Sequence, residues 1–447
     1  MSFFPKQVRV FLWLVSAFIK RHFLFVIIGL FLGVIFFFWS KPLLSFLPKL
    51  KRTEKVGLVG KFQIDNIPIG VQKLASRGLT KVKNDGSWEG DLAWEWKVDE
   101  SGKIYTFYIK DNIYWHDGKR FICGDINYNF SDVELSCKDD LTVEFKLKDP
   151  FAAFPVALSR PIFKKGLVGL GFFKVKTVKT SGQFVELILL ESLEGGTGKM
   201  KIQFRFYPTL EQLETAFKLG QINKIENLVS ALGFNQKSGI KITSQIKDDK
   251  YVGIFFDNKK DLLGDKNIRQ AFCYSVKKDW QNRALSPINP LSWAYNENVK
   301  PYDYDSGRAK ELFGKVKLEK EQTLIIGTTP EYLSLAEEIK SSWQKVFNKL
   351  KFELKIISDL QSDFDILIME KSIPSDPDQY IYWHSTQEET NFTHYKDPRI
   401  DKLLEDGRKT LDQEERKKIY FDFQRFLLED VPVCFLFHPS YYTIERE

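Results

Sequence analysis

The chain has 447 residues, a net charge of +7 and 15% aromatic residues, with four cysteines and five histidines. This length suits two or three domains with a substantial buried core. The small charge excess gives no indication of nucleic-acid binding, and the cysteines contain no Cys-x-x-Cys pair typical of a zinc cluster. We therefore expect no nucleic-acid partner, no metal site and no cofactor.

An uncharged apolar run extends from Phe23 to Trp39. Its seventeen residues, as a helix, span roughly 25 Å, near the low end for crossing a hydrocarbon core of about 30 Å. We expect residues 23–40 to form a transmembrane anchor, with an interfacial or cytoplasmic N-terminus at 1–22 and a basic linker at 41–55. A cleaved signal peptide is the alternative, although residues 40–44 lack a small-x-small cleavage pattern. Basic residues flank the run on both sides, so charge alone does not decide its orientation.

The next part of the chain, from Lys61 to Arg120, alternates turn signals with short aromatic strands such as Ile104–Ile109. Leu141–Leu147 alternates apolar and polar residues and is also predicted as a half-buried strand. Cys123 and Cys137 would close a short loop if they face an oxidising compartment, and the sequence leaves that pairing open.

After Gly171 strands and helices alternate, which predicts an α/β architecture. The predicted strands are Phe172–Val178, Phe184–Leu190, Lys201–Phe206, Tyr251–Phe256, Thr323–Thr328, Phe352–Ile357, Asp365–Met369 and Val433–Phe437. The predicted helices are Thr209–Leu219, Asp265–Lys277, a helix entered through Pro330, Pro398–Leu404 and Asp412–Leu428. The strand, helix and strand between residues 323 and 357 are spaced as a right-handed parallel βαβ unit.

Motifs that would indicate an enzyme are absent from the sequence. There is no His-Glu-x-x-His and no Gly-x-Ser-x-Gly. Asp376 and Asp378 are paired carboxylates, but in a Ser-Asp-Pro-Asp turn such groups more often cap backbone amides. We therefore expect no catalytic residues and no enzymatic activity.

Short motifs, each weak by itself, recur in one order along almost the whole chain after residue 55. They are Asp85-Gly86, Leu92–Trp96, Gly102–Phe107, Trp115–Lys119, Asp125, Asp149–Phe151, Gly169–Phe173, Arg205–Pro208, Gly220–Ile222, Gly253–Asn258, Asp265–Ala271 and Glu429–Val433. In this order and spacing the series resembles bacterial extracellular solute-binding protein family 5, which comprises dipeptide and oligopeptide receptors of ABC importers.

The resemblance implies an α/β fold of two periplasmic-binding-protein-like lobes with ligand between them and a β-rich domain inserted in the first. The expected boundaries are 56–262 with 425–447 for lobe 1, about 67–167 for the insert, and 263–424 for lobe 2. It also implies that the large domain works outside the cytoplasmic membrane, which orients the predicted single-pass anchor, and that a peptide-like ligand is delivered to ABC permease subunits. We expect the protein to be a monomer. The alternatives are a sensor or surface-interaction module without transport, or a receptor for oligosaccharide, haem or nickel.

Candidate ligand residues follow from position in this fold. Two aromatic residues come after a rigid proline-bounded loop and suit a cleft rim. Three more follow a second-lobe strand, where ligands of open α/β sheets usually lie, and one asparagine matches a family motif along the cleft. The six predicted ligand residues are Trp293, Tyr295, Asp376, Trp383, His384 and Asn391.

One family feature is missing from this sequence. In the oligopeptide receptors, an aspartate four residues before the proline of the acidic segment captures the amino group of the peptide. The corresponding position here is Ile373. The resemblance therefore leaves open how an amino group is held, with Asp376, Asp378 and Glu370 as candidate substitutes.

Overall fold

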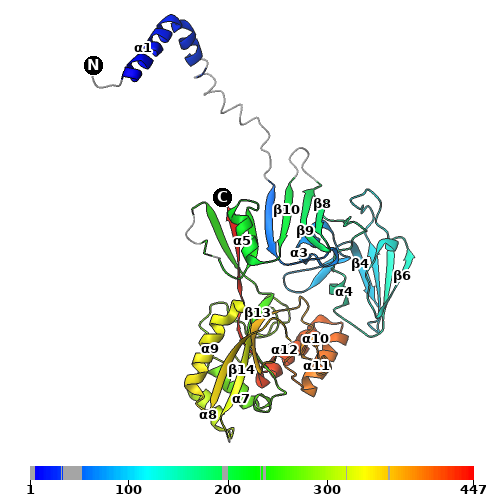
Figure 1. Ribbon diagram of the computed structural model, residues 1–447. Coiled ribbons are helices and arrows are strands. Elements are labelled where there is room, and N and C mark those ends of the chain that lie inside the picture. The colour runs from blue at the N-terminus through cyan, green and yellow to red at the C-terminus, as the bar shows by residue number, and fades with distance from the viewer. Residues whose placement is uncertain are drawn as a thin grey trace. The chain divides into compact units, whose positions relative to one another are not determined.

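The computed structural model describes residues 6–31, 33, 53–193, 200–231, 233–234, 238–318, 320–360 and 363–447 (Figure 1). The chain divides into two units, Met1–Thr53 with Glu194–Lys201 and Glu54–Leu193 with Ile202–Glu447. The second unit is called the body below.

The described part of the first unit is helical. Helix α1 runs from Lys6 to Arg21, and residues 23–31 are also helical. Within the described residues, no helix combines the length and the apolar character needed to cross a bilayer. The anchor predicted at 23–40 falls only partly within these residues, because 32 and 34–40 lie outside them.

The first lobe of the body is built on a seven-stranded sheet of order β12-β18-β11-β1-β10-β9-β8. Its strands are β1 Glu54–Val59, β8 Phe173–Ser181, β9 Phe184–Ser192, β10 Lys201–Tyr207, β11 Lys224–Leu228, β12 Ile240–Ile246 and β18 Ser440–Arg446. Helices α3 (Ile69–Ala75) and α5 (Leu210–Lys218) belong to the same lobe. The Thr209 side chain accepts a hydrogen bond from the Gln212 backbone at the start of α5, so this helix begins where the sequence predicted.

A β-rich insert interrupts the first lobe between β1 and β8. It contains the hairpin β2 (Thr80–Val82) and β3 (Trp88–Gly90) and an antiparallel sheet of order β4-β5-β7-β6. The sheet strands are β4 Ala93–Val98, β5 Ile104–Ile109, β6 Val133–Asp139 and β7 Thr142–Leu147, and the short helix α4 Phe154–Ala157 follows them. Both predicted strands, at 104–109 and 141–147, are confirmed. On β5 the alternate residues Tyr105, Phe107 and Ile109 are buried, as expected for a strand with one face on a core.

The second lobe is built on a five-stranded sheet of order β15-β14-β16-β13-β17. Its strands are β13 Lys250–Phe256, β14 Gln322–Thr328, β15 Leu350–Ile356, β16 Ile366–Ser372 and β17 Val433–Phe437. Its helices are α6 Asp261–Gly264, α7 Lys266–Tyr274, α8 Ser306–Gly314, α9 Leu333–Val346, α10 Tyr380–Trp383, α11 Pro398–Lys409 and α12 Gln413–Asp430. The predicted βαβ unit is confirmed, because β14 and β15 are parallel and α9 connects them.

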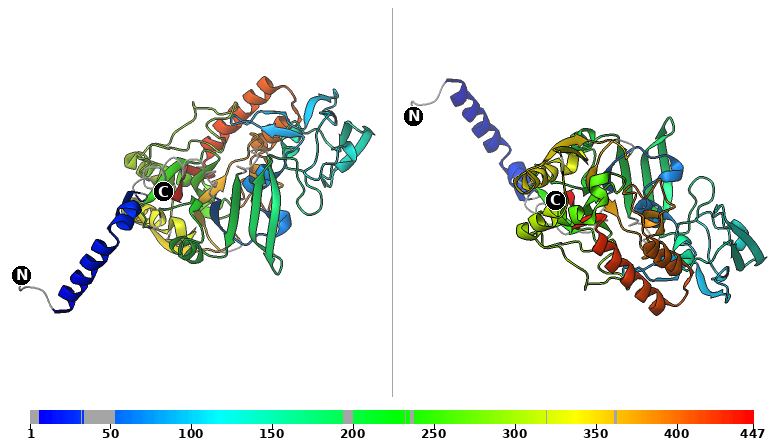
Figure 2. Two further views of the ribbon diagram at one scale, coloured as in Figure 1. Left: turned by 90° about the horizontal axis from the view of Figure 1, so that it is seen from above. Right: turned by 90° about the horizontal axis from the view of Figure 1, so that it is seen from below.

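Both faces of this second sheet are covered by helices. On β13, Val252 and Ile254 pack into a core with α7, α8 and α9, whereas Tyr251 and Phe255 pack into a separate core with α11 and α12. Figure 2 shows the yellow helix α9 and the orange to red helices α11 and α12 on opposite sides of the sheet. Strands buried on both faces carry continuous apolar runs, which explains the run at 251–256.

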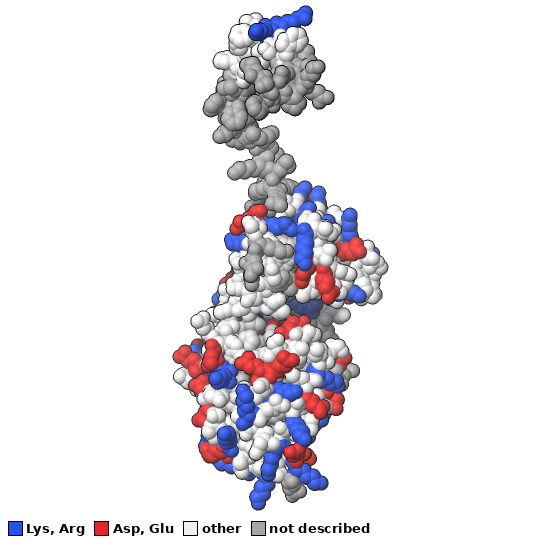
Figure 3. All heavy atoms as spheres, turned by 60° about the vertical axis from the view of Figure 1, so that its left-hand side comes forward, with Lys and Arg blue, Asp and Glu red and all other residues white. Residues whose placement is uncertain are grey.

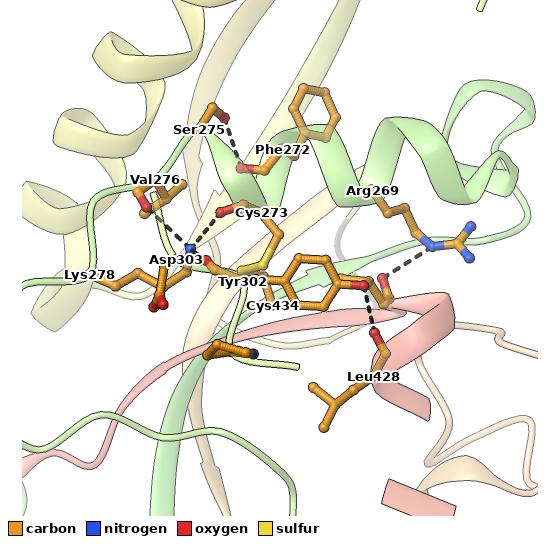
Figure 4. Close-up of a disulfide and its surroundings, with 12 residues drawn as sticks. Arg269, Phe272, Cys273, Ser275, Val276, Lys278, Tyr302, Asp303, Leu428 and Cys434 are labelled. Carbon is orange, nitrogen blue, oxygen red and sulfur yellow. Dashed lines mark hydrogen bonds between the residues drawn. A yellow bond between two sulfur atoms is a disulfide. The ribbon is translucent and has the colours of Figure 1, made fainter. Parts of the chain in front are cut away.

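All four cysteines are paired. Cys123–Cys137 lies within the insert, so the pairing that the sequence left open is present. Cys273–Cys434, which the sequence did not indicate, joins α7 to β17 across 161 residues (Figure 4).

The sheet pairing corrects the predicted lobe boundaries. β13 pairs with β16 and β17, so the strands at 250–256 and 433–437, which were predicted within lobe 1, belong to the second lobe. A strand at 440–446, which was not predicted, then returns to the first sheet as β18. One of the two crossings contains a tight turn, in which the Lys250 backbone N–H donates to the Lys247 carbonyl at 3.1 Å. The two crossing segments are residues 246–250 and 437–440.

Candidate functional site

The insert contacts the second lobe through the turn at residues 83–87. The Trp293 backbone N–H donates to the Asp85 carbonyl at 3.1 Å, and the Ala152 N–H donates to the Arg408 carbonyl at 2.7 Å. Gly86 lies against the Ser375 carbonyl, because a Cβ built on Gly86 would be 2.3 Å from that oxygen. Gly86 also has a φ of +78°, so only glycine fits this contact without strain.

Two pockets lie on either side of this turn, and both are lined by Gly86. The first, called the junction pocket, has a volume of about 290 Å³. Its lining residues are Gly86, Ser87, Trp88, Trp96, Val98, Tyr105 and Ala152 from the insert, and Trp293, Asp376, Leu411, Gln413 and Arg416 from the second lobe. Of the six predicted ligand residues, Trp293 and Asp376 are thus brought together here.

Asp376 forms a buried ion pair with Arg416. The Arg416 Nη2 lies 2.8 Å from Asp376 Oδ1, Nη1 lies 3.2 Å from Oδ2, and both residues are 5% exposed. Arg416 also donates from Nε to the Gly407 carbonyl. Burial would lower the pKa of Arg416, but the adjacent Asp376 carboxylate holds that pKa above its ordinary value. Asp376 is therefore not an unpaired carboxylate.

The second pocket, called the cleft pocket, has a volume of about 350 Å³ and draws on all three parts of the body. It is lined by Lys83, Asn84, Gly86, Gln245, Ile246, Lys247, Asp248, Asp249, Asn289, Leu291, Ile373 and Ser375. Ile373, the position where the resemblance implies an aspartate, donates its backbone N–H to the Asp249 carbonyl at 2.7 Å. Two lysines and two aspartates thus face one cavity at a crossing segment. Within the described part of the chain, these four side chains form no ion pair with one another or with other residues.

Tyr295 and the predicted residues of the 383–391 segment line neither pocket. Tyr295 is half-buried, and Trp383 is 2% exposed within the second-lobe core. The His384 ring stacks on Tyr380 at a centroid distance of 4.1 Å, and Asn391 Nδ2 donates to the Tyr395 carbonyl at 2.9 Å. These contacts hold the 383–391 segment against the second lobe.

A further set of side chains, which the sequence did not reveal, joins the lobes beside the crossing segments. Lys250 Nζ lies 2.5 Å from Glu370 Oε1 and 2.7 Å from the Tyr441 hydroxyl. The hydroxyls of Tyr441 and Tyr332 also donate to Glu370, at 2.7 and 2.9 Å. Tyr441 is on β18 of the first lobe, and the other three belong to the second lobe. A separate pocket of about 360 Å³ borders this network and shares no lining residue with the other two.

Lys371 is held between aromatic rings without a counter-ion. Its Nζ lies 4.0 Å from the Tyr382 ring centroid and 4.5 Å from that of Phe392, and no described carboxylate lies within ion-pair distance. Burial lowers the pKa of Lys371 to about 8.

This pKa predicts a pH dependence of stability. The ordinary lysine pKa is about 10.4, so between about pH 8 and pH 10 the unfolded chain binds more protons than the folded chain. The free energy of unfolding of the natural chain, relative to Lys371→Met, should therefore rise by on the order of 2 kcal/mol from pH 7 to pH 10. Urea denaturation at both pH values measures this difference. The exposed-residue variant Lys355→Met should show no such change, and an equal difference at both pH values for Lys371→Met would contradict the prediction.

Charged side chains are interspersed over the face of the body drawn in Figure 3, with lysine and arginine beside aspartate and glutamate. Among the described residues, no group of three or more His, Cys, Asp or Glu side chains is arranged to hold a metal ion.

Comparison with known proteins gives a consistent set of similarities. The profile of a family described as "Bacterial extracellular solute-binding proteins, family 5 Middle" matches residues 87–392. The oligopeptide-binding protein AppA of Bacillus subtilis is 24% identical over 455 residues, covering 85% of this chain and 83% of AppA. The probable D,D-dipeptide-binding periplasmic protein DdpA of Escherichia coli is 24% identical over 448 residues, covering 85% of each chain.

Solved structures share the fold. NikZ from Campylobacter jejuni in complex with Ni(L-His) superimposes with a TM-score of 0.73 at 24% identity, covering 89% of this chain and 94% of NikZ. AppA from Bacillus subtilis in complex with a nonapeptide gives a TM-score of 0.68 at 21% identity, covering 90% of this chain and 95% of AppA.

Proposed function

The chain belongs to the bacterial extracellular solute-binding proteins of family 5, and from this we propose that it is a peptide receptor of an ABC importer. Proteins of this family are binding receptors, so the chain is not an enzyme. Its action is closure of two lobes around a ligand, with no covalent step. AppA is described as an oligopeptide-binding protein and DdpA as a probable D,D-dipeptide-binding protein, and both descriptions support a peptide as the ligand.

The observation that carries the proposal is the charge arrangement in the cleft pocket. A short peptide at neutral pH is a zwitterion with an ammonium group at one end and a carboxylate at the other. The cleft pocket offers Asp248 and Asp249 for the first group and Lys83 and Lys247 for the second. Because these side chains are not paired with one another, ligand ends would gain charge-assisted hydrogen bonds without breaking existing pairs.

The same aspartates provide an amino-group site in place of the missing family aspartate. Ile373 lines the pocket but has no charge, whereas Asp249 bonds to it through the backbone. The volume of about 350 Å³ is near the low end of the roughly 300–1,000 Å³ usual for ligand sites, which favours a peptide of two or three residues. Of the predicted ligand residues, Trp293 and Asp376 line the adjacent junction pocket, and the other four are proposed to hold the surrounding segments in place.

Isothermal titration calorimetry on the full chain in detergent tests this function, with tri-alanine and N-acetyl-tri-alanine as probes. We expect tri-alanine to bind, and N-acetylation or the double change Asp248→Asn with Asp249→Asn to weaken binding at least tenfold, because each removes the amino-group pairing. No binding across a series from di-alanine to penta-alanine would refute a peptide receptor.

Lobe closure makes a second prediction at the Gly86 contact. Gly86→Val should weaken tri-alanine binding at least tenfold, because its side chain would collide with the Ser375 carbonyl and hold the insert away from the second lobe. Gly118→Val is a matched control, since Gly118 has a φ of +85° but no atom near an added Cβ. Equal affinities of the two variants in the calorimetric titration would show that the contact does not govern closure.

We also propose that the body works outside the cytoplasmic membrane, anchored through residues 23–40, and passes its ligand to permease subunits. Pairing of all four cysteines supports an oxidising compartment, and the uncharged run in the sequence supports the anchor. We expect protease added to intact spheroplasts to digest the body. We also expect the chain to stay in membranes that are washed with alkali. Release by alkali would argue against the anchor, and protection in intact spheroplasts would argue against the location.

A further inference from the structure

Four aromatic residues, from both the insert and the second lobe, line the junction pocket. On the insert side, the ring centroids of Trp88 and Trp96 lie 4.3 Å apart, and Tyr105 also lines the pocket. On the second-lobe side, Trp293 stands beside the Arg416 guanidinium, whose carbon is 5.4 Å from the ring centroid. Aromatic side chains of the insert and of the second lobe therefore surround the junction pocket, an arrangement that binds flat apolar groups well.

The charges that line this pocket compensate each other. Arg416 and Asp376 form a bidentate pair, and Arg416 also contacts the Tyr420 hydroxyl. A charged ligand group would have to lose water without gaining a free counter-charge, which is costly. The junction pocket thus differs from the cleft pocket, whose four charged side chains form no ion pair with any described residue, and it favours a neutral group.

Size and position restrict the occupant further. At about 290 Å³ the junction pocket is somewhat smaller than the cleft pocket and has room for one aromatic side chain. The pocket borders the cleft pocket at Gly86, which has no side chain, and Asp376 directly follows Ser375 of the cleft pocket. A peptide backbone in the cleft pocket therefore has the junction pocket beside it.

We propose that the junction pocket is a specificity subsite that receives a neutral aromatic side chain of the bound peptide, with Trp88, Trp96 and Trp293 as the residues that select it. This inference rests on the proposed peptide-binding function. Because the walls come from the insert and from the second lobe, an aromatic side chain between them also adds contacts that exist only in the closed arrangement.

Calorimetry with single-substituted tri-alanine peptides tests the subsite. Phenylalanine, lysine or glutamate is placed in turn at each of the three positions, and affinities for the full chain are compared with tri-alanine. We expect phenylalanine at one position to improve affinity at least tenfold, and lysine or glutamate at that position to give no improvement. Trp96→Ala should abolish the gain from phenylalanine, and Trp96→Phe should retain part of it.

Trp94→Ala is the matched control, because Trp94 is on the same strand, is 60% exposed and does not line the pocket. It should keep the full preference for phenylalanine. Fluorine NMR of protein labelled with 5-fluorotryptophan tests the subsite in the natural sequence. The Trp96 resonance is assigned as the one that is lost in Trp96→Phe. That resonance should shift with the phenylalanine peptide and stay in place with tri-alanine.

Three results would overturn the inference. The first is that every phenylalanine peptide binds with an affinity within threefold of that of tri-alanine. The second is that the preference for phenylalanine survives Trp96→Ala. The third is that the Trp96 resonance does not shift when the phenylalanine peptide is added. In each of them tri-alanine still binds, so the proposed function stands. If no peptide binds, tri-alanine included, the proposed function and this inference are overturned together.

Discussion

Replacing both Cys273 and Cys434 by alanine is expected to lower the free energy of unfolding of the second lobe by on the order of 5 kcal/mol. The bridge closes a loop with a sequence separation of 161, and in the chain-entropy description a longer loop restricts the unfolded chain more strongly. It also attaches β17, near the end of the chain, to α7 close to the beginning of the lobe. Without the bridge, noncovalent contacts alone hold β17, and the segment that crosses back to the first lobe, against α7.

The surroundings of this bridge explain why the loss should not be offset by local rearrangement. Lys278 donates from Nζ to the carbonyls of Cys273, Val276 and Tyr302, at 2.5, 3.2 and 2.7 Å, and the Tyr302 hydroxyl donates to Leu428 at 2.8 Å. Figure 4 shows Lys278 pointing at the end of α7 next to the sulfur atoms. These hydrogen bonds hold the end of α7, Tyr302 and the end of α12 together beside the bridge.

Denaturant unfolding followed by tryptophan fluorescence measures the loss. The double change Cys123→Ala with Cys137→Ala is the comparison, and it should cost about 3 kcal/mol in the insert, because its loop is only 14 residues in separation. The prediction fails if the Cys273 and Cys434 double variant loses less than about 1 kcal/mol, or less than the insert variant.

Asp376→Leu is expected to lower the free energy of unfolding by about 3–5 kcal/mol. The change leaves the guanidinium of Arg416 buried at 5% exposure without the one carboxylate that pairs with it among the described residues, and a buried unpaired charge is far more costly than a buried pair. Adding Arg416→Met in the same chain should recover at least half of the loss, because the charge itself is then removed. The recovery is incomplete, since the Gly407 carbonyl still loses its Arg416 donor.

A double-mutant cycle measured by urea denaturation of the ligand-free chain provides this comparison. Lys402→Met is the control for an exposed pair, because Lys402 and Asp406 are 67% and 38% exposed, and it should change stability by less than about 0.5 kcal/mol. Additive losses in the cycle would mean that Asp376 and Arg416 do not act as a pair.

Local sequence patterns predicted the elements well where one face or both faces of an element are buried. The alternation at 104–109 became β5, and the continuous apolar run at 251–256 became β13, which has a paired strand on each side. The turn chemistry of Asp85-Gly86 was visible as well, because a positive φ requires glycine at such a turn. What the turn contacts was not visible, since the Ser375 carbonyl approaches it from almost 300 residues away along the chain.

The candidate site was predicted only in part for the same reason. Trp293 and Asp376 do line a pocket, but residue type could not show that Arg416, forty residues later, would neutralise Asp376. Trp383, His384 and Asn391 lie in the predicted segment, yet they pack into the lobe, because a tryptophan or histidine after a strand suits a core as well as a cleft. Lys247, Asp248 and Asp249 were missed, as charged residues between strands are usually solvated turn residues.

By itself, the sequence determined the identity of the β-rich and α/β parts, most of the strands and helices, and the family, because these depend on short-range periodicity and on the order of local motifs. The tertiary structure alone decided which lobe holds β13 and β17, which cysteines pair, and which charges remain unpaired in the cleft. These depend on contacts between residues distant in the chain, and one extended strand or one aspartate has the same local pattern whichever partner it meets.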